Sequence, residues 1–87
     1  MVYSYILVKR IRELAETQNL SISSLAKVSG VKQSTLDNIM QGNTKNPGII
    51  NIHKLANAFG MTLSEFLDIK ELNEYIFEDE TAKKNPK

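Results

Sequence analysis

The residues that could do chemistry in this sequence are the polar side chains of a segment that runs from Ser21 to Gly42. This segment holds two short stretches with helical periodicity, joined at Gly30-Val31, which is the pattern of a helix-turn-helix. Ala26 is small enough for the second helix to cross close to it, and Gly30 permits a backbone conformation that other residues resist. The outer face of the second helix is then free to enter a DNA major groove, which is wide enough for one helix. The sequence therefore predicts that the exposed polar side chains of this segment recognise a partner through hydrogen bonds.

Catalysis and metal binding are not indicated by the residue types. The chain has no cysteine and one histidine, His53, so neither a Cys-rich zinc site nor a His-based metal centre is expected. We find no candidate pair of nucleophile and base and no glycine-rich phosphate loop. His53 lies between core positions of a predicted helix, and we expect a surface or half-buried residue there. The sequence therefore predicts a protein that is not an enzyme and has no metal and no cofactor.

Five helices are predicted to position these residues. Their bounds are indicated by capping residues, by glycines and by the spacing of apolar residues. They cover about residues 4–18, 22–29, 33–41 and 49–59, followed by a short helix that Thr62 and Glu65 begin with a capping box. Strand-like pieces occur at residues 3–8 and 75–77, near the two ends. The predicted fold class is all-α, a compact five-helix bundle with a short C-terminal extension. Its core is predicted to contain Leu7, Ile11, Leu14, Ala15, Leu25, Ala26, Leu36, Ile39, Ile52, Leu55, Ala56 and Phe59.

Four apolar residues outside this pattern are expected to be partly exposed, either as ordinary surface residues or as part of a dimer interface. They are Tyr3, Tyr5, Ile6 and Ile50.

The length and composition fit one small globular domain. The 87 residues, 9.8 kDa, leave room for a single core. A hydrophobic share of 41% and a charged share of 24% are typical of a folded chain. The longest apolar run is Tyr5–Val8, whereas a membrane-spanning helix needs about 20 apolar residues. Because no signal-peptide pattern opens the chain, we expect no membrane partner and a cytoplasmic location.

Charge is distributed unevenly along the chain. Residues 1–60 carry seven basic and three acidic side chains, net +4, whereas residues 61–87 carry four basic and seven acidic ones, net −3. A basic body suits an anionic partner. We divide the chain into a helix-turn-helix domain at residues 1–69, for which DNA is the expected anionic partner, and an acidic C-terminal extension at residues 70–87.

The extension is expected to be ordered at most to about residue 77. Ile69, Leu72 and Ile76 fall at helical spacing, so residues 69–77 either extend the fifth helix or dock as a short sixth element. Residues 78–87 have Ala82 as their one apolar side chain. Such a segment cannot offset the entropy cost of ordering its backbone, so we expect disorder there.

A series of short motifs spans about residues 4–68 in fixed order and without gaps. They are Ile11-Arg12-Glu13-Leu14, Leu20-Ser21, Leu25-Ala26, Gly30-Val31, Ser34-Thr35-Leu36, Gly42, Asn46-Pro47, Lys54-Leu55-Ala56, Ala58-Phe59-Gly60 and Leu63-Ser64-Glu65-Phe66-Leu67. In this order and spacing they resemble the lambda-repressor-like (Xre/Cro) helix-turn-helix DNA-binding family. The resemblance implies a five-helix bundle whose third helix, about residues 33–41, reads DNA.

The resemblance also implies which residues reach the bases. Family members do so at the start of this helix, here Gln33-Ser34, and Asn38 faces the same groove one turn further on. Glutamine suits a bidentate contact to adenine, and serine is permissive. The alternative is that all three are exposed polar residues on a solvated helix. Asp37 lies on or beside the same face, where it either accepts from a cytosine amino group or repels phosphates; we favour a peripheral position.

Phosphate contacts are implied on both sides of the recognition helix. The amides behind Ser21 form an anion site, because helix N-termini present N–H groups without partners. Lys32 stands at the N-cap of the third helix, where lysine is a poor capping residue. Its charge either contacts a phosphate or contributes to solubility. Residues 43–46 resemble the family segment that grips the DNA backbone. The full set expected to contact phosphates is Ser21, Lys32, Gln41, Asn43, Thr44, Lys45 and Asn46.

Three positions depart from the family pattern. The glutamine common at the first position of the second helix, which touches phosphate and steadies the recognition helix, is Ile22, which puts both roles in question. In the family, an arginine on the first helix usually pairs with a glutamate near the end of the third. In this sequence the two positions hold Ala15 and Met40. Replacing a buried ion pair with packed apolar residues is often neutral or stabilising, so we expect the fold to survive.

The leading hypothesis is a sequence-specific regulator of transcription, a phage-type or mobile-element repressor. As a homodimer it would bind two half-sites of double-stranded DNA about 34–36 Å apart. The alternative is an antitoxin-like or other protein-interaction module whose main partner is a protein, bound through the C-terminal extension. Order in residues 70–87 that depends on such a partner would favour the second hypothesis.

Overall fold

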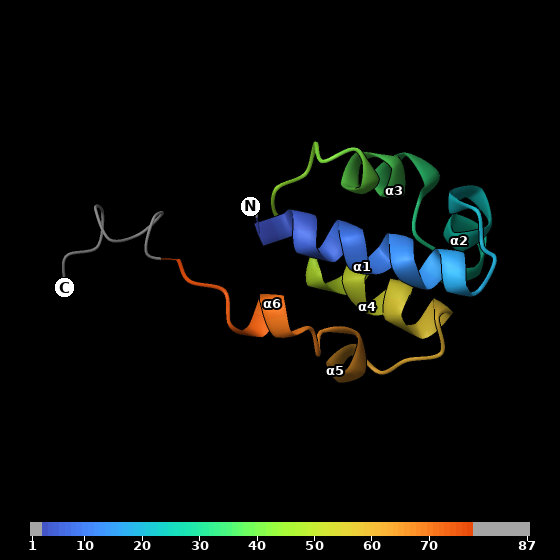
Figure 1. Cartoon of the computed structure of the whole chain (residues 1–87). Helices are drawn as coiled ribbons and strands as arrows, with labels where there is room; N and C mark the ends of the chain where they lie inside the picture. Colours follow the sequence, from blue (N-terminus) through green and yellow to red (C-terminus); the bar gives the residue numbers. More distant parts are fainter. Residues whose placement is uncertain (1–2, 78–87) are drawn as a thin grey trace.

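Residues 3–77 of the computed structural model form six helices and no strand, which confirms the predicted all-α class (Figure 1). The long helices begin and end within one residue of their predicted bounds. A sixth helix joins the five that were predicted, at the place where helical spacing allowed one. The helices are α1 (Tyr3–Thr17), α2 (Ile22–Ser29), α3 (Gln33–Met40), α4 (Ile49–Ala58), α5 (Leu63–Phe66) and α6 (Lys70–Asn73). The predicted disorder of residues 78–87 lies outside the described residues.

The turn between α2 and α3 forms as its residue types require. Ser21 caps α2, its Oγ accepting from the backbone N–H of Ser24 at 3.1 Å. Gly30 ends α2 with φ +81°, a left-handed conformation that glycine adopts without steric cost, and its N–H donates to the carbonyl of Ala26 at 3.0 Å. Val31, buried, then packs into the core. The turn from α2 to α3 is thus formed by a left-handed glycine and one buried apolar residue, while Ser21 fixes the start of α2.

The core lies between α1, α2, α3, α4 and α5. Leu25, Leu36 and Leu55 are fully buried, and every residue of the predicted core is buried except Leu14, which is partly buried against it. Our expectation that Ile6 is partly exposed is wrong, since its exposed fraction is 2%. Helix α1 is covered on more than one side, so Ile6, Leu7 and Val8 are all buried. Tyr5 and Ile50 are exposed, as expected, and Tyr3 is half-buried.

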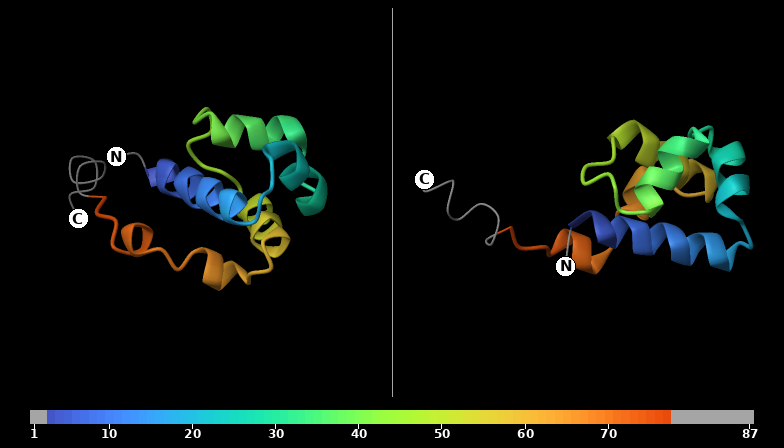
Figure 2. Two further views of the ribbon diagram at one scale, coloured as in Figure 1. Left: turned by 45° about the vertical axis from the view of Figure 1, so that its right-hand side comes forward. Right: turned by 90° about the horizontal axis from the view of Figure 1, so that it is seen from above.

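The helices are arranged with α3 on one side of α1 and α4 and with α5 and α6 on the opposite side (Figures 1 and 2). Helix α2 packs against α3 and α4, α5 against α4, and α6 against α1. Helices α3 and α6 therefore occupy opposite sides of the described part of the molecule.

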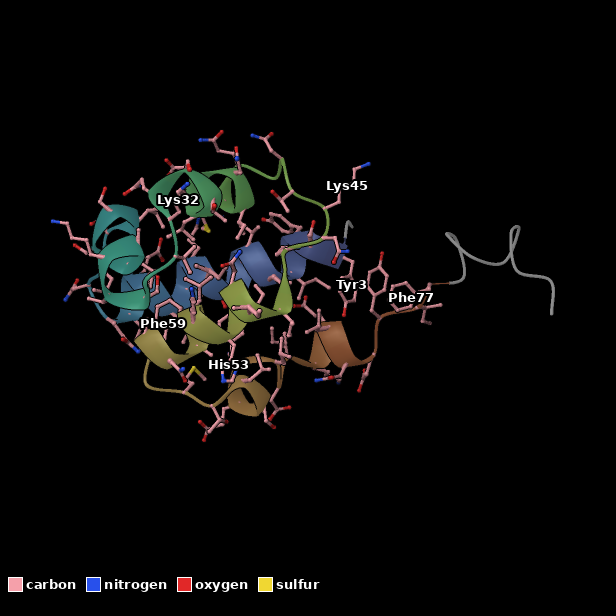
Figure 3. All side chains as sticks on the ribbon, turned by 180° about the vertical axis from the view of Figure 1, so that it is seen from behind. Tyr3, Lys32, Lys45, His53, Phe59 and Phe77 are labelled. Atoms are coloured by element: carbon pink, nitrogen blue, oxygen red, sulfur yellow. The ribbon has the colours of Figure 1, made fainter. Side chains whose placement is uncertain are left out.

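Residues 70–75 contact α1 through three kinds of interaction. Leu72 is buried, Lys9 Nζ lies 3.9 Å from Glu71 Oε2, and the ring of Tyr3 packs edge-on against Tyr75 with centroids 4.9 Å apart. The ring of Phe77 also lies beside that of Tyr3, with ring centroids 5.3 Å apart (Figure 3). Residues 70–77 thus pack on the start of α1.

Arg10 joins α1 to the end of α5. Its Nε donates to the carbonyl of Phe66 at 3.1 Å and its Nη2 to the carbonyl of Glu65 at 3.0 Å. The guanidinium also lies 5.8 Å from the centre of the Phe66 ring. Carbonyls in the last turn of a helix lack partners within that helix. Arg10 donates to two of them, and the carbonyl of Glu65 also accepts from the N–H of Asp68 at 3.2 Å.

The helices of the described residues are too short or too polar for any of them to cross a bilayer.

Candidate nucleic-acid interface

Helix α3 divides its residues between the core and the surface. Leu36 and Ile39 are buried, with exposed fractions of 0% and 1%. The three residues predicted to contact bases, Gln33, Ser34 and Asn38, are all exposed. The fold therefore brings them together on the outer side of α3, the face a DNA groove would meet.

The first of these side chains is held by a neighbour on its own helix. Gln33 Nε2 donates to Asp37 Oδ1 at 3.2 Å, and Asp37 itself is half-buried. Residues four apart on a helix face the same way, so the pair lies along one edge of the exposed surface. The sequence indicated a peripheral place for Asp37 and gave no sign of this bond.

A cluster of amides closes the C-terminal end of α3. Asn43 Nδ2 lies 3.4 Å from Asn38 Oδ1 and 3.3 Å from Gln41 Oε1, donating to both. The chain turns into this cluster at Gly42, whose φ is +78°, and the N–H of Asn43 donates to the carbonyl of Asn38 at 3.0 Å. A residue expected to contact bases is thereby tied to two residues expected to contact phosphates.

The loop after α3 places its cation at the surface. Lys45 and Asn46 are exposed and Thr44 is half-buried. Figure 3 shows Lys45 on this loop, extending away from the body of the protein. These positions suit contacts to a DNA backbone on the flank of the recognition helix.

Two further phosphate contacts were predicted at helix starts, and both side chains are exposed. Ser21 caps α2, accepting from the N–H of Ser24, and helix starts of this kind present further backbone N–H groups without partners in the helix. Lys32 stands at the cap of α3 and forms no cap hydrogen bond, as its residue type led us to expect. Its ammonium group therefore has no role in closing the helix.

The departures from the family pattern have a consistent structural outcome. Ala15 is buried, and Met40 is half-buried against the core, so apolar packing occupies both positions. Ile22 also packs against the core. The side chain at residue 22 therefore cannot form a hydrogen bond with Gln33.

Sequence reasoning missed Arg12 as a member of this surface. Arg12 is exposed on α1 and lines a recess of about 300 Å³ together with Tyr5, Gln41 and Lys45. Helical spacing puts Tyr5 and Arg12 on one side of α1, but only the packing of α1 beside the end of α3 brings Arg12 to Lys45.

The electrostatics of this surface favour an anion. Residues 21–48 carry three basic side chains and one acidic one. Within residues 3–77 the one ion pair is that of Lys9 with Glu71, on the other side of the molecule, so Arg12, Lys32 and Lys45 form no ion pair with another described residue. His53 is exposed on α4, and the described residues contain no group of three side chains suited to hold a metal ion.

A glycine-linked helix pair with an exposed polar second helix and exposed cations beside it defines the class of helix-turn-helix DNA-binding domains. The helix-turn-helix family model matches residues 11–66. The chain belongs to the lambda-repressor-like (Xre/Cro) helix-turn-helix family, and it is a DNA-binding regulator.

A solved structure supports the same assignment. The chain is similar to the crystal structure of the prophage Lp1 protein 11, with 31% sequence identity and a TM-score of 0.73. The similarity covers 82% of this chain and 93% of that one. A comparison with curated proteins gave no match.

Proposed function

We propose that this protein binds a specific sequence of double-stranded DNA and represses transcription for a phage or another mobile element. The observation that carries the proposal is the two-sided character of α3, which buries Leu36 and Ile39 and exposes Gln33, Ser34 and Asn38. The similarity to a prophage protein supports the mobile-element part. A regulator of this kind acts in the cytoplasm, where that DNA is.

In the proposed complex α3 lies in the major groove. Gln33, Ser34 and Asn38 contact base edges, with the glutamine in a bidentate contact to adenine. The DNA backbone is held on both flanks of α3, which sets the position of the helix without reading sequence. The residues proposed for these backbone contacts are Ser21, Lys32, Gln41, Asn43, Thr44, Lys45 and Asn46.

We further propose that the protein acts as a homodimer on a two-fold symmetric operator. Tyr5, Ile49 and Ile50 have exposed fractions of 47%, 58% and 69%, and these apolar side chains supply surface for a second copy. Sedimentation of wild type and of Ile50→Asp tests this point. A dimer that dissociates in the variant supports it, and a monomeric wild type at micromolar concentration contradicts it.

Selection of bound duplexes from a random pool tests the proposed function directly. We expect the wild type to enrich a motif with two-fold symmetry and a footprint of two half-sites about one helical turn apart. The double variant Gln33→Ala/Asn38→Ala should bind duplexes without enriching that motif. Failure of the wild type to enrich any motif would contradict sequence-specific binding.

A second candidate function is a protein-interaction module of antitoxin type. Ile76, in the acidic extension, has an exposed fraction of 70%, and this observation favours a protein partner. Hydrogen exchange in residues 69–77, with and without the product of a neighbouring gene, tests this alternative. Protection of those amides that requires the partner would support it, and unchanged exchange would contradict it.

A further inference from the structure

The pair of Gln33 and Asp37 places an acidic group on the surface that is to meet DNA. Gln33 is exposed, Asp37 is half-buried, and the bond from Nε2 to Oδ1 is 3.2 Å. Asp37 is the one acidic residue in residues 21–48, and its negative charge opposes the attraction that the nearby lysines exert on phosphates. Its presence there therefore needs a reason other than affinity.

Within residues 3–77 no other side chain bonds to the amide of Gln33. Ile22, at the start of the neighbouring helix, has no hydrogen-bonding group and packs against the core. Among the described residues, Asp37 is thus the side chain that holds the long, exposed side chain of Gln33 in one conformation.

We propose that Asp37 is a positioning residue that fixes which end of the Gln33 amide faces the bases, and so sets the base preference at that position. An ionised carboxylate only accepts hydrogen bonds, so a reversed amide would place Oε1 against Oδ1, two acceptors in contact. Nε2 therefore stays on the Asp37 side. The inference rests on the proposed function, since it assigns a role within sequence-specific DNA binding.

The fixed amide keeps the groups that adenine recognition needs. The bond to Asp37 uses one of the two N–H groups of Nε2, which leaves one N–H and Oε1. Adenine presents N7 as acceptor and its N6 amino group as donor, which match this pair. Guanine presents two acceptors, N7 and O6, so Oε1 finds no donor there. A preset amide also loses less side-chain freedom when the complex forms.

Selection from a random duplex pool with variants at one position tests the proposal. In Asp37→Ala we expect the preference for adenine at the Gln33-dependent base pair to fall about three- to tenfold, the cost of ordering a free side chain. Asp37→Asn should lose a similar factor, because an amide both donates and accepts and so permits both orientations of Gln33. Asp37→Glu, which keeps an acceptor-only group on the same helix face, should retain most of the preference.

Two controls separate this role from others. Glu16→Gln removes one exposed negative charge from α1 and leaves α3 unchanged, so it should select the wild-type motif. Gln33→Ala identifies the base pair at which preference depends on Gln33. Removal of charge in Asp37→Ala should raise affinity for all sequences, an effect that base preference does not register. Melting curves of every variant show that each is folded.

Three outcomes would overturn the proposal. If Asp37→Ala and Asp37→Asn keep the wild-type motif while their melting temperatures fall, the bond serves only the stability of α3. If Gln33→Ala changes no base pair, Gln33 reads no base and Asp37 has nothing to position. In both cases the wild type still selects a motif and the proposed function stands. If the wild type selects no motif, both the proposed function and the proposed role of Asp37 are wrong.

Discussion

At the residue scale, Gln33 and Lys45 represent the two kinds of contact that a DNA-binding surface makes. The amide of Gln33 is exposed on α3, where base edges would lie, and Lys45 is exposed on the loop beside it. Contacts to base edges carry sequence information, whereas contacts to phosphates set position and affinity. The two roles leave different signatures in binding experiments.

Gln33→Ala should weaken binding to the selected operator by about 1–3 kcal/mol and relax the preference at one base pair. The physical reason is the loss of a bidentate contact on one base, with the other contacts kept. Fluorescence titration against the operator and against single-base variants at that position measures both effects. If the variant selects an unchanged motif, Gln33 does not contact a base.

Lys45→Ala should weaken binding to all sequences about equally. One phosphate contact fewer releases one counterion fewer, so the slope of log K against log salt should fall in magnitude by about 1. Titrations at several salt concentrations, on operator and random duplexes, provide the measurement. Lys54→Ala, which removes a lysine from the exposed side of α4, is the matched control and should leave the slope unchanged. A changed sequence preference at constant slope would contradict the assignment.

At the element scale, local signals in the sequence were sufficient for the helices. The cap at Ser21, the glycine at residue 30 and the capping box of Thr62 with Glu65 all form as predicted, because each depends on neighbours within a few residues. The exposed side of α3 was predictable for the same reason. Contacts between helices were not, since Arg10 bonds to a carbonyl 56 positions away and no local pattern marks it.

The bridge from Arg10 to the end of α5 should stabilise the fold. Arg10→Met keeps the apolar stem but removes two charge-assisted hydrogen bonds, and we expect a loss of about 1–2 kcal/mol in the free energy of unfolding, given that the group is partly exposed. Urea unfolding followed by circular dichroism measures it. Arg12→Met, at an exposed arginine of the same helix, is the control. Equal stabilities of the two variants would show that the bridge contributes nothing.

At the scale of the whole molecule, the fold separates the predicted DNA surface from residues 70–77. Helix α3 lies on one side of α1 and α4, and α6 lies on the other (Figure 1). The misjudged burial of Ile6 belongs to this scale, because α1 is covered on several sides by elements far from it in sequence. The sequence allowed two places for residues 69–77, and only the packing on α1 distinguishes them.

Two truncations test whether the extension belongs to the folded unit. Ending the chain after Phe77 leaves every described contact in place, so the melting temperature and operator affinity should remain near those of the full chain. Ending it after Asp68 removes buried Leu72, the ring contact of Tyr75 with Tyr3, and the ion pair of Glu71 with Lys9. We expect this second cut to lower stability by about 2–4 kcal/mol, mostly from lost apolar burial and aromatic packing.

The motif selected by the shorter chain separates stability from recognition. Because α6 lies away from α3, a chain that ends after Asp68 and is still folded at low temperature should select the wild-type motif. Removal of acidic residues should also raise its affinity for random duplexes slightly at low salt, where their repulsion of phosphate is least screened. A first cut that unfolds the protein, or a second that changes neither melting temperature nor oligomeric state, would place the boundary of the folded unit elsewhere than at Phe77.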